Sequence, residues 1–96
     1  MLVIITYDVN TKSHGGAKRL RRVAKTCVDF GRRVQNSVFE CELDASQFLI
    51  VKSKLLAIID VTRDSLRLYS LGNNYKNRVE HHGVKPSFDV KNPLVI

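Results

Sequence analysis

Asp8 is an acidic residue that could do chemistry, and it directly follows residues 2–7, a short run of apolar, β-branched and aromatic side chains. A carboxylate at the end of a strand offers oxygen ligands to a hard divalent cation such as Mg²⁺. One carboxylate per chain is too few for a tight site, but two copies of Asp8 facing each other across a twofold axis could share one ion with a substrate phosphate. In the alternative interpretation, Asp8 ends the strand and accepts hydrogen bonds from the following loop.

Four further side chains are candidates for chemistry or binding, and each has two interpretations. Tyr7 points to the other side of the strand, and an unperturbed phenol with a pKa of about 10 is a poor base, which favours packing or positioning. Arg33 could clamp a phosphate or simply be an exposed arginine at a strand end. Ser37 could bind a phosphate oxygen or cap a turn. Phe39 is either a core residue or a surface for base stacking.

Positive charge is concentrated in one part of the chain. Eight basic residues and one acidic residue lie between positions 12 and 33, so this segment accounts for the net charge of +7. On a helical wheel Lys18, Arg22 and Lys25 share one stripe, with Arg19 and Arg21 beside it. A cluster of this kind indicates binding to phosphate backbones, whereas the alternative is an ordinary solvated helix face.

The remaining candidate groups carry weaker signals. Gly15 and Gly16 could present backbone N–H groups to an anion, but the full pattern of a P-loop is missing. His81 and His82 are adjacent, so a strand would send them to opposite faces and they make no metal pair. The two cysteines, Cys27 and Cys41, have no zinc spacing and are expected to be small core residues with free thiols.

The hydrophobic pattern predicts one small α+β domain, since 96 residues are too few for two domains. Residues 2–7 predict a strand buried on both faces, and residues 17–30 predict an amphipathic helix followed by Gly31 as its C-cap. The apolar side of that helix carries Ala17, Leu20, Val23, Ala24, Cys27 and Val28. Residues 33–43 predict one long strand, or two strands separated at Asn36-Ser37.

A second helix begins at Asp44, because Asp44 and Gln47 have the spacing of a capping box. Residues 65–71 predict another strand, the sequence GNN at 72–74 a turn, and residues 79–82 a short extra strand. This order predicts a ferredoxin-like βαββαβ fold with two helices on one face of the sheet. From about residue 76 we expect an irregular tail and a C-terminal strand, whose apolar residues 94–96 dock on a sheet edge or a partner chain.

Three segments together resemble the CRISPR-associated "Cas-two" family, the smaller of the two proteins of the spacer-acquisition complex. They are the strand that ends in YDV at 7–9, the basic helix that leads to GRR at 31–33 and, most specifically, RVQNSVFEC at 33–41. The resemblance extends through LGNNY at 71–75, which is similar to the branch found with type I-C systems.

The resemblance implies a ferredoxin-like homodimer whose sheets pack together, with each C-terminal strand added to the partner's sheet. It also implies a CRISPR adaptation protein that holds duplex protospacer DNA and bridges integrase subunits in a heterohexameric complex. A metal-dependent endonuclease activity on duplex DNA or single-stranded RNA is implied as well, with Mg²⁺ or Mn²⁺ held by Asp8 of each subunit. The candidate catalytic residues are then Asp8, Tyr7, Arg33 and Phe39, and the candidate nucleic-acid contacts are Lys18, Arg19, Arg22, Lys25, Arg33 and Ser37.

Two functional hypotheses therefore remain open, a metal-dependent phosphodiesterase and a non-catalytic DNA-binding adaptor. A toxin-like endoribonuclease with the same fold is a third, against which the RVQNSVFEC segment argues. The apolar runs at 2–5 and 55–59 are much shorter than the roughly 20 residues of a membrane span. The N-terminus shows no secretory leader, so we expect a prokaryotic cytoplasmic protein without a membrane partner.

Overall fold

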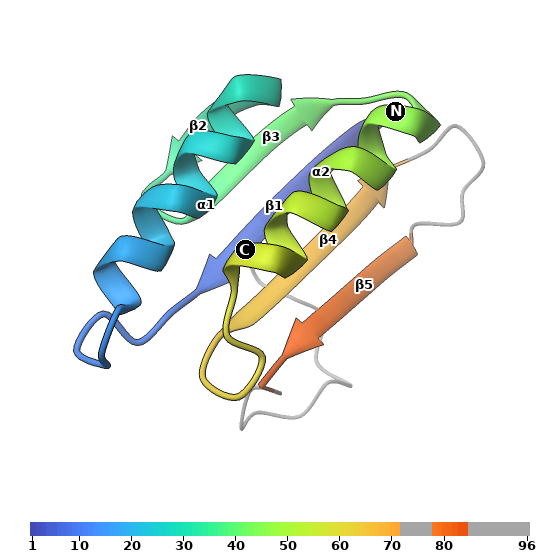
Figure 1. The fold of residues 1–96 in the computed structure, drawn as a ribbon. Coiled ribbons are helices and arrows are strands. Elements are labelled where there is room, and N and C mark those ends of the chain that lie inside the picture. Colours follow the sequence, from blue (N-terminus) through green and yellow to red (C-terminus); the bar gives the residue numbers. More distant parts are fainter. Residues whose placement is uncertain (72–77, 85–96) are drawn as a thin grey trace.

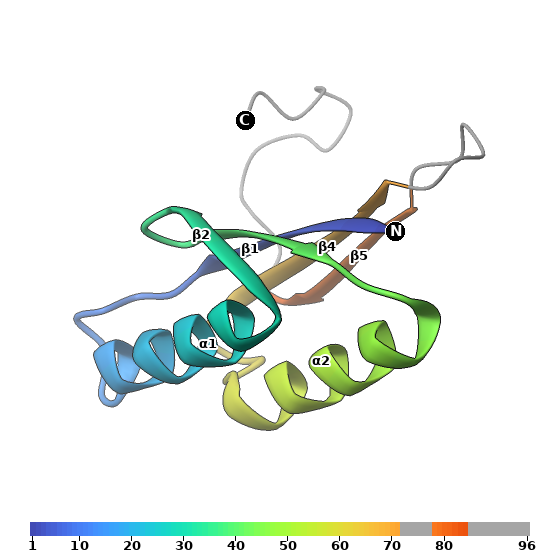
Figure 2. The same cartoon turned by 90° about the horizontal axis from the view of Figure 1, so that it is seen from above.

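The computed structural model describes residues 1–71 and 78–84, which form a five-stranded antiparallel sheet and two helices (Figure 1). The elements in chain order are β1 (Leu2–Asp8), α1 (Gly16–Phe30), β2 (Gly31–Gln35), β3 (Val38–Glu42), α2 (Ala45–Ile58), β4 (Ser65–Leu71) and β5 (Arg78–Gly83). The strand order across the sheet is β2-β3-β1-β4-β5, so β1 lies at the centre. Both helices cover the same face of the sheet (Figure 2). This architecture confirms the predicted ferredoxin-like α+β fold with one additional strand.

The hydrophobic core lies between the helices and the inner face of the sheet. On β1, Val3, Ile5 and Tyr7 alternate toward the helices and are almost completely buried. They pack with Leu66 and Leu68 of β4 and with core residues of both helices, Val23, Ala24, Cys27, Val51 and Leu55. A period of two in the strands and an apolar stripe on each helix therefore meet in one layer.

The prediction that the first strand is buried on both faces is wrong for the single chain. Leu2, Ile4 and Thr6 point away from the helices and are only partly buried. No helix covers this second face in the part of the chain that the structure describes (Figure 2). We call it the uncovered face of the sheet. A similar correction applies to Val28 of α1, which is 49% exposed because the packing side of the helix is centred on Val23, Ala24 and Cys27.

The turn at Asn36-Ser37 separates β2 from β3, which confirms the two-strand interpretation of residues 33–43. The register between these strands shifts between Arg33 and Gln35, so Val34 has no partner in the ladder. Gly31 follows α1 directly and starts β2, with an extended φ of −169°. A Cβ atom on Gly31 would lie 2.2 Å from the carbonyl oxygen of Glu40, so the glycine permits the close approach of β2 and β3.

The predicted start of the second helix is also confirmed. The Asp44 carboxylate accepts a hydrogen bond from the backbone N–H of Gln47, and the Gln47 side chain accepts one from the backbone N–H of Asp44. The strand predicted at 65–71 matches β4, and the strand at 79–82 lies within β5, which pairs with β4 of the same chain. The turn predicted at 72–74 and the apolar residues 94–96 lie outside the described residues.

Both cysteines are buried free thiols, as the sequence predicts. Burial raises the pKa of Cys27 to about 12, so this thiol stays protonated at neutral pH. None of the helices in the described ranges, 1–71 and 78–84, is long and apolar enough to cross a membrane.

Candidate metal and nucleic-acid site

Asp8 lies at one end of the sheet together with three other polar residues, Ser37, Ser65 and His81. Asp8 is the last residue of β1, and the neighbouring positions belong to the start of β3 and the start of β4. On one side the backbone N–H of Tyr7 donates to the carbonyl oxygen of Ser37 over 3.0 Å. On the other side Asp8 is paired directly with Ser65. The Asp8 side chain is exposed and lies on the uncovered face, because it alternates with the inward-facing Tyr7.

Ser65 and His81 extend this polar row across the sheet. The Nε2 atom of His81 lies 2.9 Å from the Ser65 hydroxyl oxygen and 2.9 Å from the carbonyl oxygen of Val84. A carbonyl oxygen can only accept, so Nε2 carries the proton and donates. The hydroxyl proton of Ser65 is therefore available to a second acceptor, such as the neighbouring carboxylate or a phosphate oxygen. Sequence reasoning missed Ser65, since only the β1–β4 register places it opposite Asp8.

Asp8 can supply one carboxylate to a metal ion, but the described residues of one chain do not complete a metal site. In the described part of the chain, no group of three or more His, Cys, Asp and Glu side chains could hold a metal ion. A hard cation with oxygen ligands fits the chemistry of Asp8 once further oxygens, beyond those of the described residues, complete its coordination shell. A second copy of Asp8 and a substrate phosphate could provide them.

Tyr7 and Phe39, two of the candidate catalytic residues, are placed in the core. Tyr7 is 1% exposed and its hydroxyl donates a hydrogen bond to Asp64. Burial and this hydrogen bond raise the pKa of Tyr7 far above its usual value, which excludes a role as a base at neutral pH. Phe39 is fully buried and packs in the hydrophobic core. Both side chains face the helices, whereas Asp8 faces the opposite way.

Arg33 stabilises the β2–β3 turn. Its Nε and one terminal nitrogen donate to the carbonyl oxygen of Asn36 over 2.8 and 2.6 Å. Its guanidinium also lies over the ring of Phe39, 5.5 Å from the ring centroid. These contacts hold the turn that carries Ser37 beside β1. The structure thus places Arg33 at the same end of the sheet as Asp8, but with its guanidinium engaged by the turn.

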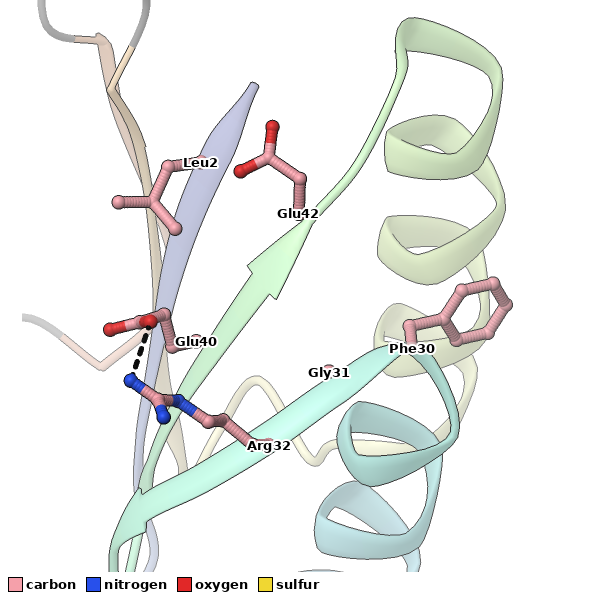
Figure 3. A pocket seen from close by; sticks show the side chains of 6 residues that line it. All are labelled: Leu2, Phe30, Gly31, Arg32, Glu40 and Glu42. Atoms are coloured by element: carbon pink, nitrogen blue, oxygen red, sulfur yellow. Dashed lines mark hydrogen bonds and ion pairs between the residues drawn. The ribbon is translucent and has the colours of Figure 1, made fainter.

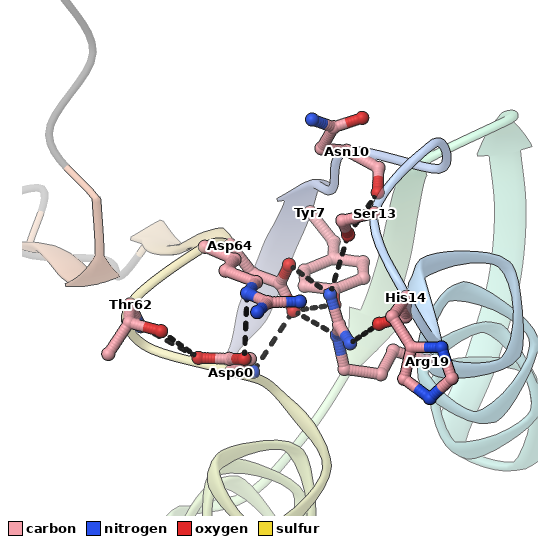
Figure 4. A network of polar contacts seen from close by, with 9 residues as sticks. Tyr7, Asn10, Ser13, His14, Arg19, Asp60, Thr62 and Asp64 are labelled. Carbon is pink, nitrogen blue, oxygen red and sulfur yellow. Dashed lines mark hydrogen bonds and ion pairs between the residues drawn. The ribbon is translucent and has the colours of Figure 1, made fainter.

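Arg19 differs from the other basic residues of α1 because it is engaged inside the protein (Figure 4). Its Nε donates to Asp64 Oδ2 over 2.8 Å, and Nη2 donates to Asp64 Oδ1 over 3.1 Å. Asp64 is fully buried. Burial alone would raise the pKa of Asp64, but hydrogen bonds from Arg19, the backbone of Asp60 and Tyr7 outweigh it and lower that pKa. Sequence reasoning missed Asp64 entirely.

The other cations of α1 form an exposed row on the outer side of the helix, made up of Lys18, Arg21, Arg22 and Lys25. Within residues 1–71 and 78–84, only Lys25 among them has an ion-pair partner, Asp29 at 3.7 Å, and both side chains are largely exposed. This basic row belongs to the helix layer, whereas Asp8 lies on the uncovered face of the sheet. A single chain therefore keeps its candidate metal ligand and its candidate phosphate contacts on different sides.

A shallow pocket of about 320 Å³ lies at the opposite end of the sheet from Asp8 (Figure 3). Its lining consists of Leu2, Phe30, Gly31, Arg32, Glu40 and Glu42. The one cation in this set, Arg32, is paired with Glu40 at 3.0 Å. A lining with two carboxylates and an already paired arginine does not suit a phosphate ligand. The pocket contains none of the candidate site residues.

The chain is similar to one protein family over most of its length. The model of the family described as CRISPR associated protein Cas2 matches residues 1–79. A CRISPR-associated endonuclease Cas2 from Halalkalibacterium halodurans is 60% identical over 95 residues, which cover 99% of both chains. A CRISPR-associated endoribonuclease Cas2 from Rhodospirillum rubrum is 53% identical and covers 99% of this chain and 100% of its own.

A solved structure of Cas2 from Streptococcus pyogenes superimposes with a TM-score of 0.72 and 56% sequence identity. The match covers 78% of this chain and 90% of that chain. These similarities confirm the family resemblance that the YDV, GRR and RVQNSVFEC segments indicate. The chain belongs to the CRISPR-associated Cas2 family.

Proposed function

We propose that this protein is a metal-dependent endonuclease that hydrolyses phosphodiester bonds of DNA or RNA in CRISPR adaptation. The observation that carries the proposal is the exposed Asp8 carboxylate at the end of the central strand, on the uncovered face. Relatives named endonuclease and endoribonuclease support the same activity. Because one relative is named an endonuclease and the other an endoribonuclease, experiment must decide whether the substrate is DNA or RNA.

A homodimer would complete the metal site. The uncovered face carries partly exposed apolar side chains from four strands, namely Leu2, Ile4, Val38, Leu71 and Val79. Burying such a surface against a second copy removes apolar area from water, and a twofold axis repeats each residue opposite itself. Because Asp8 lies on this face, at the end of the central strand, its two copies would then both lie between the packed sheets.

In this site the protein's own residues would bind and orient the substrate. Two copies of Asp8 would hold Mg²⁺ or Mn²⁺, which when bound supplies an activated water and offsets charge on the phosphate. The available hydroxyl proton of Ser65 is suited to a phosphate oxygen or to the Asp8 carboxylate. Ser37, fixed beside Tyr7 on the other side, offers a second hydroxyl.

The test is cleavage of labelled duplex DNA and single-stranded RNA by pure protein, with Mg²⁺ and with EDTA. We expect Asp8→Asn to lose cleavage while keeping its fold and its affinity for nucleic acid. Asp29→Asn on α1 is the matched control, because it makes the same chemical change on an exposed residue far from the site. Cleavage by Asp8→Asn at the wild-type rate would contradict the proposal and would point to a contaminating nuclease.

We propose a second, compatible role as a duplex-binding adaptor that bridges integrase subunits during spacer acquisition. The exposed cations of α1 favour it, because they lie away from Asp8 and could hold DNA without any reaction. If this is the main role, Asp8→Asn supports spacer acquisition at the normal rate. The cytoplasmic location that the sequence predicts remains a prediction.

Duplex binding can be assigned to α1 through its salt dependence. The triple variant K18Q/R22Q/K25Q should bind duplex DNA more weakly, with the slope of log K against log [salt] reduced by about 0.9 for each phosphate that the helix no longer neutralises. The variant R32Q/K54Q/R63Q removes the same number of charges from other elements and should keep the wild-type slope. Equal slopes for the two triple variants would show that α1 has no special role in binding.

A further inference from the structure

Asp64 is the one charged residue among the fully buried side chains of the described ranges, and it receives donors from three parts of the chain. The Tyr7 hydroxyl comes from β1, the Arg19 guanidinium from α1 and the backbone N–H of Asp60 from the loop before β4, the last over 3.0 Å. Figure 4 shows these groups converging on the carboxylate. A buried charge with this many donors is held in one geometry.

Arg19 extends the same network into the loop that follows Asp8. Its Nη1 donates to the carbonyl oxygen of His14 over 3.0 Å, and its Nη2 donates to the hydroxyl of Ser13 over 3.3 Å. Together with the two bonds to Asp64, these contacts use four of the five N–H donors of a guanidinium. The Arg19 side chain is only 14% exposed. Few N–H donors and little exposed surface of Arg19 are therefore left to contact a phosphate.

The start of α1 lacks the usual stabilising groups. Gly15 at the N-cap has a left-handed φ of 78° and provides no side-chain cap, and the first turn contains no acidic residue. Lys18 and Arg19 there are unfavourable for the positive end of the helix dipole. The buried Asp64 carboxylate compensates the charge of Arg19 there through their ion pair.

We propose that Asp64 and Arg19 are positioning residues, which clamp the loop after Asp8 and the start of α1 onto β1 and so set Asp8 relative to the basic row. The proposal rests on the nuclease function proposed above. Arg19, on this account, makes no contact with nucleic acid, and the exposed set on α1 is Lys18, Arg21, Arg22 and Lys25. This clamp reaches Asp8 through Tyr7, which precedes Asp8 in β1 and whose hydroxyl donates a hydrogen bond to Asp64.

The decisive variant is R19Q/D64N, because it removes the ion pair and leaves the net charge at +7. Replacing both partners avoids an unpaired buried charge, and a glutamine at position 19 is too short to reach Ser13 and His14 as well. We expect duplex affinity and its salt slope to stay at wild-type values. We expect the maximal cleavage rate to fall by about tenfold or more, since a shift of about 1 Å in a reacting group has effects of this size.

Hydrogen exchange gives a readout that does not depend on cleavage. In R19Q/D64N the backbone amides of residues 9–16 should exchange faster, while those of α2 should not change. A salt slope reduced by about 0.9, with loop exchange unchanged, would overturn the proposal and make Arg19 a phosphate contact. A wild-type cleavage rate in the double variant would overturn the positioning role.

Tyr7→Phe provides a milder second variant if the double variant does not fold. It removes only the hydroxyl from the network, so the cleavage rate should fall less than in R19Q/D64N and duplex binding should not change. An unchanged cleavage rate in Tyr7→Phe would then count against the clamp. Failure of the nuclease proposal is distinguished by a different result, namely normal cleavage by Asp8→Asn. In that case the hydrogen-exchange rates and the salt slope would still decide the role of Arg19.

Discussion

Two aspartates show how surroundings decide what the same carboxyl group does. Asp8 is exposed at the end of β1 and makes no ion pair in the described part of the chain, which leaves its oxygens available to ligands. Asp64 is fully buried and saturated by donors from Tyr7, Arg19 and the backbone of Asp60. The exposed Asp8 carboxylate is suited to binding a metal ion or substrate, whereas the buried Asp64 carboxylate is suited to holding β1, α1 and the loop before β4 together.

The low pKa of Asp64 predicts how stability depends on acid. A carboxyl whose pKa is lower in the folded state stabilises the fold above its unfolded pKa of about 3.9, and this contribution disappears as the pH falls through the folded pKa. We therefore expect the free energy of unfolding, measured in urea, to fall between pH 5 and pH 2, and to fall less in R19Q/D64N. Asp60→Asn is a positive control, because hydrogen bonds from Thr62 lower the pKa of Asp60 as well, so this variant should also show a reduced acid dependence. Equal acid dependence in wild type and R19Q/D64N would exclude Asp64 as a contributor.

The two helices begin in different ways, and this difference affects their functions. The start of α2 is stabilised locally by the reciprocal hydrogen bonds of Asp44 and Gln47. The start of α1 has no such cap and relies on the distant Asp64 through Arg19. The start of α1 therefore depends on a residue far away in the sequence, whereas the start of α2 is stabilised by residues of its own first turn.

The capping box of α2 provides a prediction at this scale. Asp44→Ala should lower the free energy of unfolding by about 1 kcal/mol, because a backbone N–H at the helix start loses its acceptor. Urea denaturation monitored by circular dichroism measures this change. Ser46→Ala, at an exposed position in the first turn, is the control and should have little effect. A destabilisation by Asp44→Ala no greater than that of the control would show that the cap does not stabilise the protein.

At the scale of the whole molecule, the helices cover one face of the sheet and leave the other open (Figure 2). The basic row of α1 is on the helix side, and Asp8 and Ser65 are on the open side. If two copies join through their uncovered faces, the basic rows lie outside and the two Asp8 residues lie between the sheets. Nucleic-acid binding and metal binding would then use different surfaces of one assembly.

Val79→Lys tests this arrangement. Val79 lies on the uncovered face and is 52% exposed, so a lysine there is compatible with a folded monomer. We expect the mass measured by light scattering to fall from that of two 10.9-kDa chains to that of one, with cleavage abolished and the fold preserved. Leu49→Lys, on the exposed side of α2, should leave the dimer intact. A Val79→Lys variant that stays dimeric would contradict packing through this face.

Local sequence patterns were sufficient to predict most of the elements. The strand before Asp8, the helix at 17–30, the turn at Asn36-Ser37 and the capping box at Asp44 are each encoded by residues that are close together in the chain. Their physical causes, namely hydrophobic period, turn preference and side-chain capping, act over a few residues. The family resemblance drew on the same local segments.

The surroundings of the functional residues, in contrast, depended on the tertiary structure. Arg19 is one of five basic residues on α1, and only the packing of α1 on the sheet brings it to Asp64, which is 45 residues away. Ser65 faces Asp8 through the β1–β4 register, and a shift of one residue would send its side chain to the opposite face. Such pairings are set by the packing of the whole sheet and its helices, so residue type and spacing within one segment cannot determine them.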